Sequence, residues 1–558
     1  MLRNSFVELR ARERAFQLLD KHEGKEILDP FYRVKSPHLE PQGIVPSFDD
    51  GVVLVRGKMQ DKDVLIVSIE GKFQGGGIGE VAGAKIAMAL EMALEENKEG
   101  HPVYPVIILD TGGVRLQEAN YGLLSISEIG NMIVALKKYV PVIGLVPGLV
   151  GSFGGMSITS ALMSYLIATN KARVGLNGPE VIEQEAGVRE FDASDKALTW
   201  DTIGARQRVA TGVIDELVKD DVEVIREAII TAIVNKKDSK RTEKANFFLN
   251  YLSQMDASEK LTPEKYIADY EANNEKEFKV KEAYEGDQRL NNTRGYKWFA
   301  GLTGMKQPTS DFPTVLSKTV EINKRPMTFV TITTNDNNRF YRVRNGEAGL
   351  VEGFVVSKVL EQVIAEDKDK KEKRPIIAII DVPSQAYGYN EELIGIHMAL
   401  ASSAEFYARA RQAGHPVVGL IVGNAISGAF LAHGLQCNRL IALNDEQINV
   451  QAMSKESAAR VTNRTLEEVE EATKKIPAMA YDIKNFEKLG ALFALVDGIE
   501  ADRVSETDVE KMQDVMLKAI ASTENAPTDL SFRYETEQAK SYGRVATRQV
   551  REMIREQW

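Results

Sequence analysis

Short apolar runs rich in β-branched residues alternate along the chain with longer segments whose apolar positions recur at helical spacing. Four such runs, residues 104–109, 141–147, 374–380 and 416–422, are each followed at once by an aspartate or a glycine. Continuous runs of this kind are typical of strands in a parallel sheet, because crossover helices cover both faces of the sheet. The pattern therefore predicts an α/β fold.

One part of the pattern occurs twice at a constant spacing. Residues 141–152 and residues 416–427 share proline, glycine and serine positions, each shifted by 275 residues. The repeat predicts two copies of a strand–helix–strand–helix unit. Between them, residues 235–313 are rich in charged and turn residues, which indicates the last helices of the first copy and a linker. We expect two domains, residues 1–310 and residues 311–558.

Composition narrows the class of protein. The 558 residues carry a net charge of −11 and are 43% apolar, which excludes a largely disordered chain and argues against a nucleic-acid partner. One cysteine excludes an intrachain disulfide and a multi-cysteine zinc ribbon. The N-terminus has no apolar signal segment, and no apolar run approaches the roughly 20 residues of a membrane span. We expect a cytoplasmic protein with no stable membrane insertion, and no metal site, since no metal-ligand spacing occurs.

In both copies a strand runs into a loop of small residues that leads into a helix. Small residues let the backbone approach a ligand closely, and the amides of a helix N-terminus are free to donate. Two converging amides could form an oxyanion hole for a thioester carbonyl that becomes an enolate. The candidate catalytic positions are Gly112, Gly113, Gly154 and Gly155 in the first copy, and Ser384, Ser427 and Gly428 in the second.

A serine hydrolase is a weaker interpretation. Ser152 and Ser427 both precede a helical pattern, but neither lies in a Gly-x-Ser-x-Gly elbow. His433 is six residues beyond Ser427, which places the two side chains on different sides of a helix. We expect both serines to act as helix caps.

The other polar candidates have structural interpretations. We expect His397 to be a half-buried residue of a helix over residues 391–401, and Cys437 to behave as a small buried hydrophobe. The arginines of the C-terminal helical pattern are three or four residues apart and so share one face, which we expect to be solvated; they are Arg544, Arg548, Arg551 and Arg555.

Several longer motifs resemble one family. Residues 11–20 resemble the opening helix of acyl-CoA carboxyltransferase β subunits, and residues 75–80, 112–118 and 177–184 resemble internal motifs of that family in the same order. Residues 380–383 and 423–429 resemble its α-type half. Within the family, the most similar motifs are those of malonate decarboxylase, whose β and γ subunits are usually separate chains; here they appear fused in the order β then γ. The motifs of this narrower resemblance are residues 36–44, 175–180 and 381–388.

The resemblance implies two crotonase-like (ββα-spiral) domains, related by the internal pseudo-repeat, with the active site between them. It also implies a malonyl thioester substrate, held by the CoA-derived prosthetic group of an acyl carrier protein, and release of CO₂ to leave an acetyl thioester. The implied partners are an acyl carrier protein subunit and an acyl-carrier transferase subunit; a homo-oligomer is also compatible. No cofactor is expected to be bound covalently on this chain. On motif position, the candidate substrate-binding residues are Gly76, Gly77, Arg115, Gln117, Gln385 and Tyr387.

Two alternatives stay open at this point. The chain could be a carboxyltransferase that passes the carboxyl group to biotin on a partner, because transfer and decarboxylation share their first step. One copy could also be a scaffold without catalytic residues. The proton that quenches the enolate could come from a loop or acid side chain; the candidates are Tyr387, Tyr389, Asn390, Glu118 and Glu80.

Overall fold

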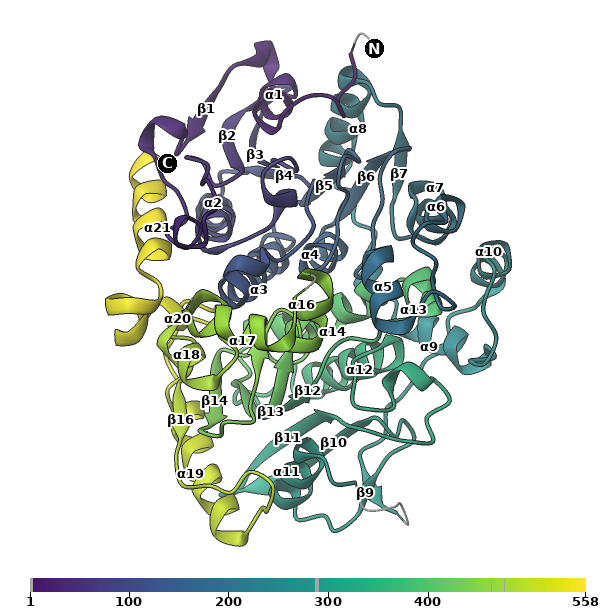
Figure 1. Cartoon of the computed structure of the whole chain (residues 1–558), viewed down its shortest axis with the longest axis vertical. Helices are drawn as coiled ribbons and strands as arrows, with labels where there is room; N and C mark the ends of the chain where they lie inside the picture. Colours follow the sequence, from purple (N-terminus) through teal and green to yellow (C-terminus); the bar gives the residue numbers. More distant parts are fainter. Residues whose placement is uncertain (1–3, 287–290, 463, 476) are drawn as a thin grey trace.

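The computed structural model describes residues 4–286, 291–462, 464–475 and 477–558. Residues 4–286, here called the first half, form most of the upper part of the molecule in Figure 1, and their last segment, from residue 245 on, reaches down beside the second half. The second half, residues 291–558, forms most of the lower part. Each half contains one large mixed sheet, and helices from both halves lie between the two sheets (Figure 1). The α/β expectation is confirmed.

The first sheet has seven strands in chain order, and its hydrophobic runs lie in the middle of it. Its first three strands pair antiparallel, and the remaining pairs are parallel. The strands are β1 (Gly24–Ile27), β2 (Val52–Met59), β3 (Lys62–Ile69), β4 (Tyr104–Ile108), β5 (Ile143–Val146), β6 (Tyr165–Thr169) and β7 (Glu216–Val218).

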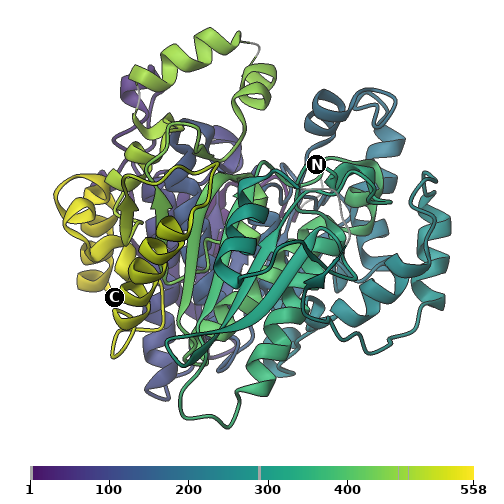
Figure 2. The same ribbon diagram turned by 90° about the horizontal axis from the view of Figure 1, so that it is seen from below.

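The second sheet repeats this plan. An antiparallel hairpin is again followed by parallel strands, and a short extra strand pairs with the end of β13. The strands are β10 (Val315–Ile322), β11 (Arg325–Ile332), β12 (Ile376–Val382), β13 (Val417–Ile426), β14 (Arg439–Leu443), β15 (Val450–Gln451) and β16 (Ala494–Val496). Figure 2, seen from below, shows these strands in front of the first half. A separate two-stranded ribbon joins β8 (Tyr284–Glu285) to β9 (Pro308–Thr309).

Helices follow the strands in both halves. Those of the first half are α1 (Ala11–Gln17), α2 (Glu80–Lys98), α3 (Ala119–Leu136), α4 (Gly155–Leu162), α5 (Pro179–Ala186), α6 (Lys196–Ile203), α7 (Ala205–Ala210), α8 (Val222–Val234), α9 (Ala245–Gln254) and α10 (Pro263–Ala272). Those of the second are α11 (Arg294–Thr303), α12 (Leu350–Glu366), α13 (Tyr389–Ile394), α14 (Ile396–Gln412), α15 (Ser427–Ala432), α16 (Lys455–Thr462), α17 (Leu466–Lys475), α18 (Ile483–Lys488), α19 (Glu506–Ala521), α20 (Phe532–Glu535) and α21 (Val545–Gln557).

One pair of aspartates, one in each half, makes a similar hydrogen bond. Asp110 follows β4, and its Oδ1 accepts a hydrogen bond of 2.5 Å from the amide of Val150. Asp381 lies near the end of β12, and its Oδ1 accepts one of 3.1 Å from the amide of Asn424. In each half a carboxylate thus binds an amide of the next stretch of chain in the repeat, in the loop after β5 in the first half and near the end of β13 in the second. Gly423 must be a glycine, because a Cβ there would lie 2.0 Å from Asp381 Oδ1.

The two halves pack through their helices. Helices α3 and α4 of the first half contact α14 and α15 of the second, and α11 packs against the strands of the second sheet although it precedes residue 310. A Cβ on Gly155 would lie 2.8 Å from Leu431 Cδ1 of the opposite half. The N-terminus of α4 therefore lies against α15 across the interface. The expected boundary at residue 310 stays a prediction.

The C-terminal helix departs from expectation. Helix α21 runs back along α2 of the first half (Figure 1). Arg544, just before α21, is fully buried and donates to both carboxylate oxygens of Glu128 at 3.0 and 2.9 Å. Arg551 pairs with Glu91, and Arg555 with Glu95. The prediction of a solvated arginine face was wrong for Arg544 and Arg551, which are buried against the first half, whereas the side chains of Arg548 and Arg555 stay partly exposed.

Other residue-level expectations had mixed outcomes. Cys437 is buried, as predicted. His397 is completely buried rather than half-buried, since it lies in the first turn of α14, which packs between the halves. Ser152 and Ser427 do not cap helices: the N-cap positions are Gly154 and Ile426, and neither makes a side-chain capping bond. Each serine lies one or two residues away from the position that capping requires.

In the described part of the chain, no helix is both long enough and apolar enough to cross a membrane. Within the same residues, no group of three or more His, Cys, Asp or Glu side chains is placed to hold a metal ion.

Candidate functional site

A cavity of about 220 Å³ is lined by the N-termini of both α4 and α15. It brings together seven of the residues predicted from the sequence, from both halves of the chain: Gly112, Gly154, Gly155, Gln385, Tyr387, Ser427 and Gly428. Apolar side chains form most of the remaining wall, among them Val114, Leu123, Leu176, Val181, Leu431 and Met453. The cavity is the candidate active site.

Unusual backbone conformations shape its two edges. Gly154 has a φ of +54°, which a glycine adopts without strain, and α4 begins directly after it. Ser427 has a φ of +60° at the first position of α15, where a residue with a Cβ is strained. Strain of this kind persists where surrounding structure enforces it, which is common at functional sites.

The predicted backbone donors of the first half are mostly engaged already. The amides of Gly112, Gly113 and Gly154 donate to Gly75 O at 2.8 Å, Thr111 Oγ1 at 3.1 Å and Leu176 O at 3.0 Å. In the described part of the chain, the amides of Val114 and Gly155 have no hydrogen-bond acceptor. Both residues line the cavity, and a Cβ on Gly113 would lie only 3.3 Å from the nitrogen of Gly155. Val114 and Gly155 are therefore lining residues whose amides remain free to donate to a ligand.

Side chains from the two halves are joined beside the cavity. The amide of Gly428 donates to Gln385 Oε1 at 3.0 Å, and Gln385 Nε2 donates to Asn177 Oδ1 at 2.9 Å. Asn177 Nδ2 in turn donates to the carbonyl of Ala386 at 3.2 Å. Gln385 thus acts as a link between the first turn of α15 and the first half.

Six predicted residues lie outside the cavity lining. Arg115 is buried in ion pairs with Asp50 at 2.8 Å and Glu118 at 2.6 Å, so its guanidinium is committed to the protein. A Cβ on Gly76 would lie 2.0 Å from the carbonyl oxygen of Asp110, which gives this glycine a packing role. The others outside the lining are Gly77, Gly113, Gln117 and Ser384. Their contact with a substrate stays a prediction.

Of the expected proton donors, only Tyr387 lines the cavity. Burial raises the pKa of Tyr387 well above its usual value, so the phenol keeps its proton at neutral pH. Glu118 is buried against Arg115 and Ser36, and Glu80 is bound by His38 and Thr547. Both carboxylates therefore hold the fold together around the site.

Sequence reasoning missed Asn177 and Gly178 as site residues. Both line the cavity, in the loop between β6 and α5. The available signal was the family-like motif at residues 177–184, but no counterpart at the 275-residue spacing drew attention to it. A Cβ on Gly178 would meet only Glu180 Oε2 at 3.6 Å, so this glycine leaves open space.

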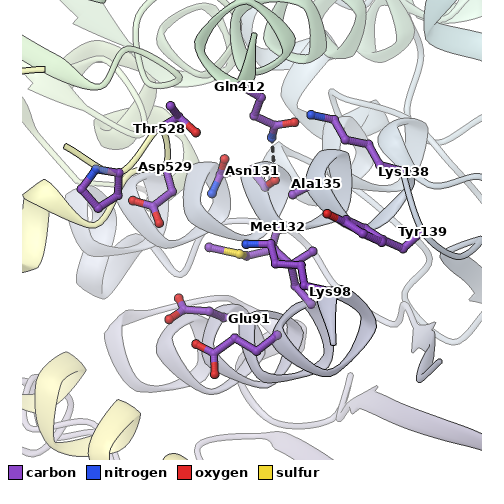
Figure 3. Close-up of a pocket in the computed structure, with 13 residues that line it drawn as sticks. Glu91, Lys98, Asn131, Met132, Ala135, Lys138, Tyr139, Gln412, Thr528 and Asp529 are labelled. Carbon is purple, nitrogen blue, oxygen red and sulfur yellow. Dashed lines mark hydrogen bonds between the residues drawn. The ribbon is translucent and has the colours of Figure 1, made fainter. Parts of the chain in front are cut away.

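A larger cavity of about 330 Å³ lies elsewhere in the interface (Figure 3). It is formed by the C-terminal parts of α2 and α3 together with Gln412 and residues 527–529. Two of its acids, Glu91 and Glu95, are already paired with Arg551 and Arg555 of α21. None of the residues predicted from the sequence as site residues lines this larger cavity, so we assign the active site to the smaller one.

Two family descriptions match successive parts of the chain. Residues 9–282 match the carboxyl transferase domain, and residues 343–558 match the malonate decarboxylase gamma subunit.

Individual relatives resemble one part of the chain at a time. Malonyl-S-ACP:biotin-protein carboxyltransferase MADC of Malonomonas rubra is 41% identical over 242 residues, which is 42% of this chain and 76% of that protein. Malonyl-S-ACP:biotin-protein carboxyltransferase MADD of the same organism is 37% identical over 170 residues, which is 30% of this chain and 58% of that protein. A Pseudomonas malonate decarboxylase hetero-tetramer in complex with malonate contains a chain that is 47% identical with a TM-score of 0.47, over 48% of this chain and 97% of that one.

Proposed function

Since this chain belongs to the carboxyltransferase family and joins the β-type and γ-type parts of a malonate decarboxylase, we propose that it removes CO₂ from a malonyl thioester. The thioester would be carried on the CoA-derived prosthetic group of an acyl carrier protein, and the product would be the acetyl thioester. The chain would work in a complex with that carrier and with an acyl-carrier transferase. No group bound covalently to this chain takes part.

The proposed chemistry needs backbone donors and a proton source. When the bond between the α-carbon and the carboxylate breaks, its electron pair forms an enolate whose charge lies on the thioester oxygen. The free amides of Val114 and Gly155 are placed to stabilise that charge, and losing one such donor typically costs about 10²–10³ in rate. The α-carbon then takes a proton from Tyr387, whose phenol is protonated at neutral pH.

The size of the cavity is the observation that favours decarboxylation over carboxyl transfer to biotin. At about 220 Å³ it is smaller than the roughly 300–1,000 Å³ of pockets that enclose a drug-sized ligand. This space suits an acyl group at the end of a thiol arm. It favours decarboxylation, because a transferase must also hold the bicyclic ring of biotin beside the departing carboxylate.

Carboxyl transfer to biotin on a partner protein is the second candidate. The names of MADC and MADD describe that reaction. Biotin would then enter from a separate protein, and the site would have to widen to admit it.

The two candidates are separated by a CO₂ assay. The purified chain is given an acyl carrier protein loaded with the malonyl thioester, and CO₂ and acetyl thioester are measured with and without avidin. We expect equal amounts of both products and no effect of avidin. Turnover that stops with avidin, or that requires a biotinylated protein, would establish the transferase instead. A Tyr387→Phe variant should retain binding of the thioester and lose most of the turnover.

A further inference from the structure

The carboxylate of Glu392 crosses from the second half into the first. Glu392 lies in α13 and has no exposed surface. Its Oε1 accepts the amide of Leu176 at 2.9 Å, and its Oε2 accepts the amide of Asn177 at 3.0 Å. One side chain of the second half therefore fixes two consecutive backbone amides of the loop that precedes α5.

Arg208 of the first half completes this arrangement. It is fully buried, and its Nη2 lies 3.3 Å from Glu392 Oε1 and donates to the Glu392 carbonyl at 2.8 Å. Its Nη1 and Nε donate to the carbonyls of Leu393 and Val174 at 3.0 and 2.8 Å. Burial raises the pKa of the Glu392 carboxyl, and the charge of Arg208 counteracts that rise.

The neighbouring loop is shaped to admit this carboxylate. A Cβ on Gly175 would lie 2.6 Å from Glu392 Oε1, so any larger residue there would push the carboxylate away. The glycine has no positive φ that would otherwise require it. Close approach of Glu392 is therefore the reason for a glycine at this position.

Two chains of hydrogen bonds lead from Glu392 to the cavity. The first chain passes through Leu176, whose amide binds Glu392 and whose carbonyl accepts the amide of Gly154 at 3.0 Å. The carboxylate thereby fixes Gly154, the residue just before the free amide of Gly155. The second chain passes through Asn177, whose side-chain oxygen accepts a hydrogen bond from Gln385 at 2.9 Å. Gln385 in turn accepts the amide of Gly428 at the start of α15. One carboxylate thus reaches the N-termini of both helices.

We propose that Glu392 is a positioning residue that sets the two helix N-termini of the cavity relative to one another. It touches no reacting atom and acts through Leu176 and Asn177. The inference rests on the function proposed for the cavity. A misplacement of about 1 Å can cost 10²-fold in rate, so a network that holds both edges affects the chemical step more than binding.

The test compares Glu392→Gln with a matched control. In Glu392→Gln one amide of the loop loses its acceptor and Arg208 loses its counter-charge. We expect kcat for CO₂ release to fall about 10–100-fold while KM changes little. Glu128→Gln is the control, because Glu128 is also buried, also pairs with an arginine across the halves, and accepts its hydrogen bonds from Arg544, which does not line the cavity. We expect a similar loss of thermal stability and near-normal kcat.

A second variant covers the case in which Glu392→Gln does not fold. Gly175→Ala leaves every charge in place and only displaces the carboxylate, and it should lower kcat in the same way. Amide hydrogen exchange then tests the positioning without substrate: exchange at residues 150–158 and 424–432 should accelerate in both site variants and not in Glu128→Gln.

The outcomes separate the two proposals. Normal kcat and unchanged exchange in Glu392→Gln or Gly175→Ala would overturn the role of Glu392. An unmodified chain that releases no CO₂ would overturn the proposed function, while the exchange measurement would still decide whether Glu392 holds the two helix N-termini.

Discussion

At the scale of single residues, the space inside the cavity depends on glycines, because these residues have no side chain to fill it. Gly428 has no positive φ, and a Cβ there would lie 3.3 Å from Gln385 Oε1 and 3.4 Å from Leu400 Cδ1. A methyl group therefore fits after small shifts, whereas a longer side chain must displace Gln385 or enter the cavity.

Gly428→Ala and Gly428→Leu should form a graded pair. We expect Gly428→Ala to keep most of its turnover, and Gly428→Leu to lose more than about 10²-fold in kcat while circular dichroism stays normal, because the link through Gln385 breaks. If the leucine variant is as active as the unmodified chain, the second half serves as a scaffold rather than as part of the site.

Glu352 should make the stability of the protein depend on pH. It is fully buried in α12, and burial raises its pKa to about 7 from an ordinary value of 4.5. The folded state keeps this proton to higher pH than the unfolded chain does. The stabilising contribution is therefore complete below pH 4.5 and is lost as the pH rises through 7.

Unfolding in denaturant between pH 5 and 8 tests this expectation. Buried His397, His415 and His433, whose pKa values burial lowers, add a slope of opposite sign, so the comparison is with a variant. We expect the free energy of unfolding of the unmodified chain, minus that of Glu352→Gln, to fall by up to about 3 kcal/mol over the range. Glu391, whose pKa burial also raises to about 7, contributes a slope of the same sign in both proteins and cancels in this difference. Glu510→Gln, a change at an exposed position of α19, should leave the pH dependence unaltered.

Sequence reasoning at this scale identified positions better than it identified partners. Seven predicted residues, among them Gly155 and Gly428, line one cavity because small residues at strand ends mark places where the backbone approaches a ligand. It did not identify Glu392 or Arg208, because the residues that they bind are up to 216 positions away. It also could not tell which loop amides were already satisfied inside the chain.

At the scale of elements, α21 shows the limit of helical periodicity. Arg551 and Arg555 pair with Glu91 and Glu95 of α2, whereas Arg548 pairs with Glu535 of α20, so the arginines do not all meet the same partner. What covers the face with Arg551 and Arg555 depends on α2, which lies in the other half of the chain and gives no local signal. Burial then divides the arginines into two classes, because Arg544 has no exposed side-chain surface whereas that of Arg555 is 53% exposed.

Two substitutions should separate these classes. Arg544→Met leaves Glu128 buried without a counter-charge, and we expect a loss of about 3–5 kcal/mol in the free energy of unfolding. Arg555→Met removes an exposed ion pair with Glu95 and should cost at most about 1 kcal/mol. Equal effects of the two changes in chemical denaturation would show that burial of the pair is not what holds α21.

At the scale of the whole molecule, the repeat was predictable and the pairing was not. A constant spacing of 275 residues, together with buried strand runs, sufficed for two sheets of the same plan. The way in which the halves face each other depends on contacts such as Gly155 with Leu431, which neither copy reveals alone.

Because the halves are held by their interface and by α21, the connecting chain should be dispensable once they have folded. Residues 275–277 are exposed and belong to no helix or strand, so a protease site can be placed there. After cleavage we expect both fragments to elute together from gel filtration and to keep full turnover. Separation of the fragments would mean that the covalent connection, and not the interface, keeps the cavity closed.

The return of α21 to α2 also sets the order in which the protein can be completed on the ribosome. Arg551 is 460 residues later in the chain than its partner Glu91. At about 5–20 residues per second, the surface of α2 that α21 covers waits roughly 20–90 s for its last helix to be synthesised. A nascent chain that stops early therefore leaves this surface of the first half uncovered, where chaperones and proteases can find it, and only a finished chain conceals it.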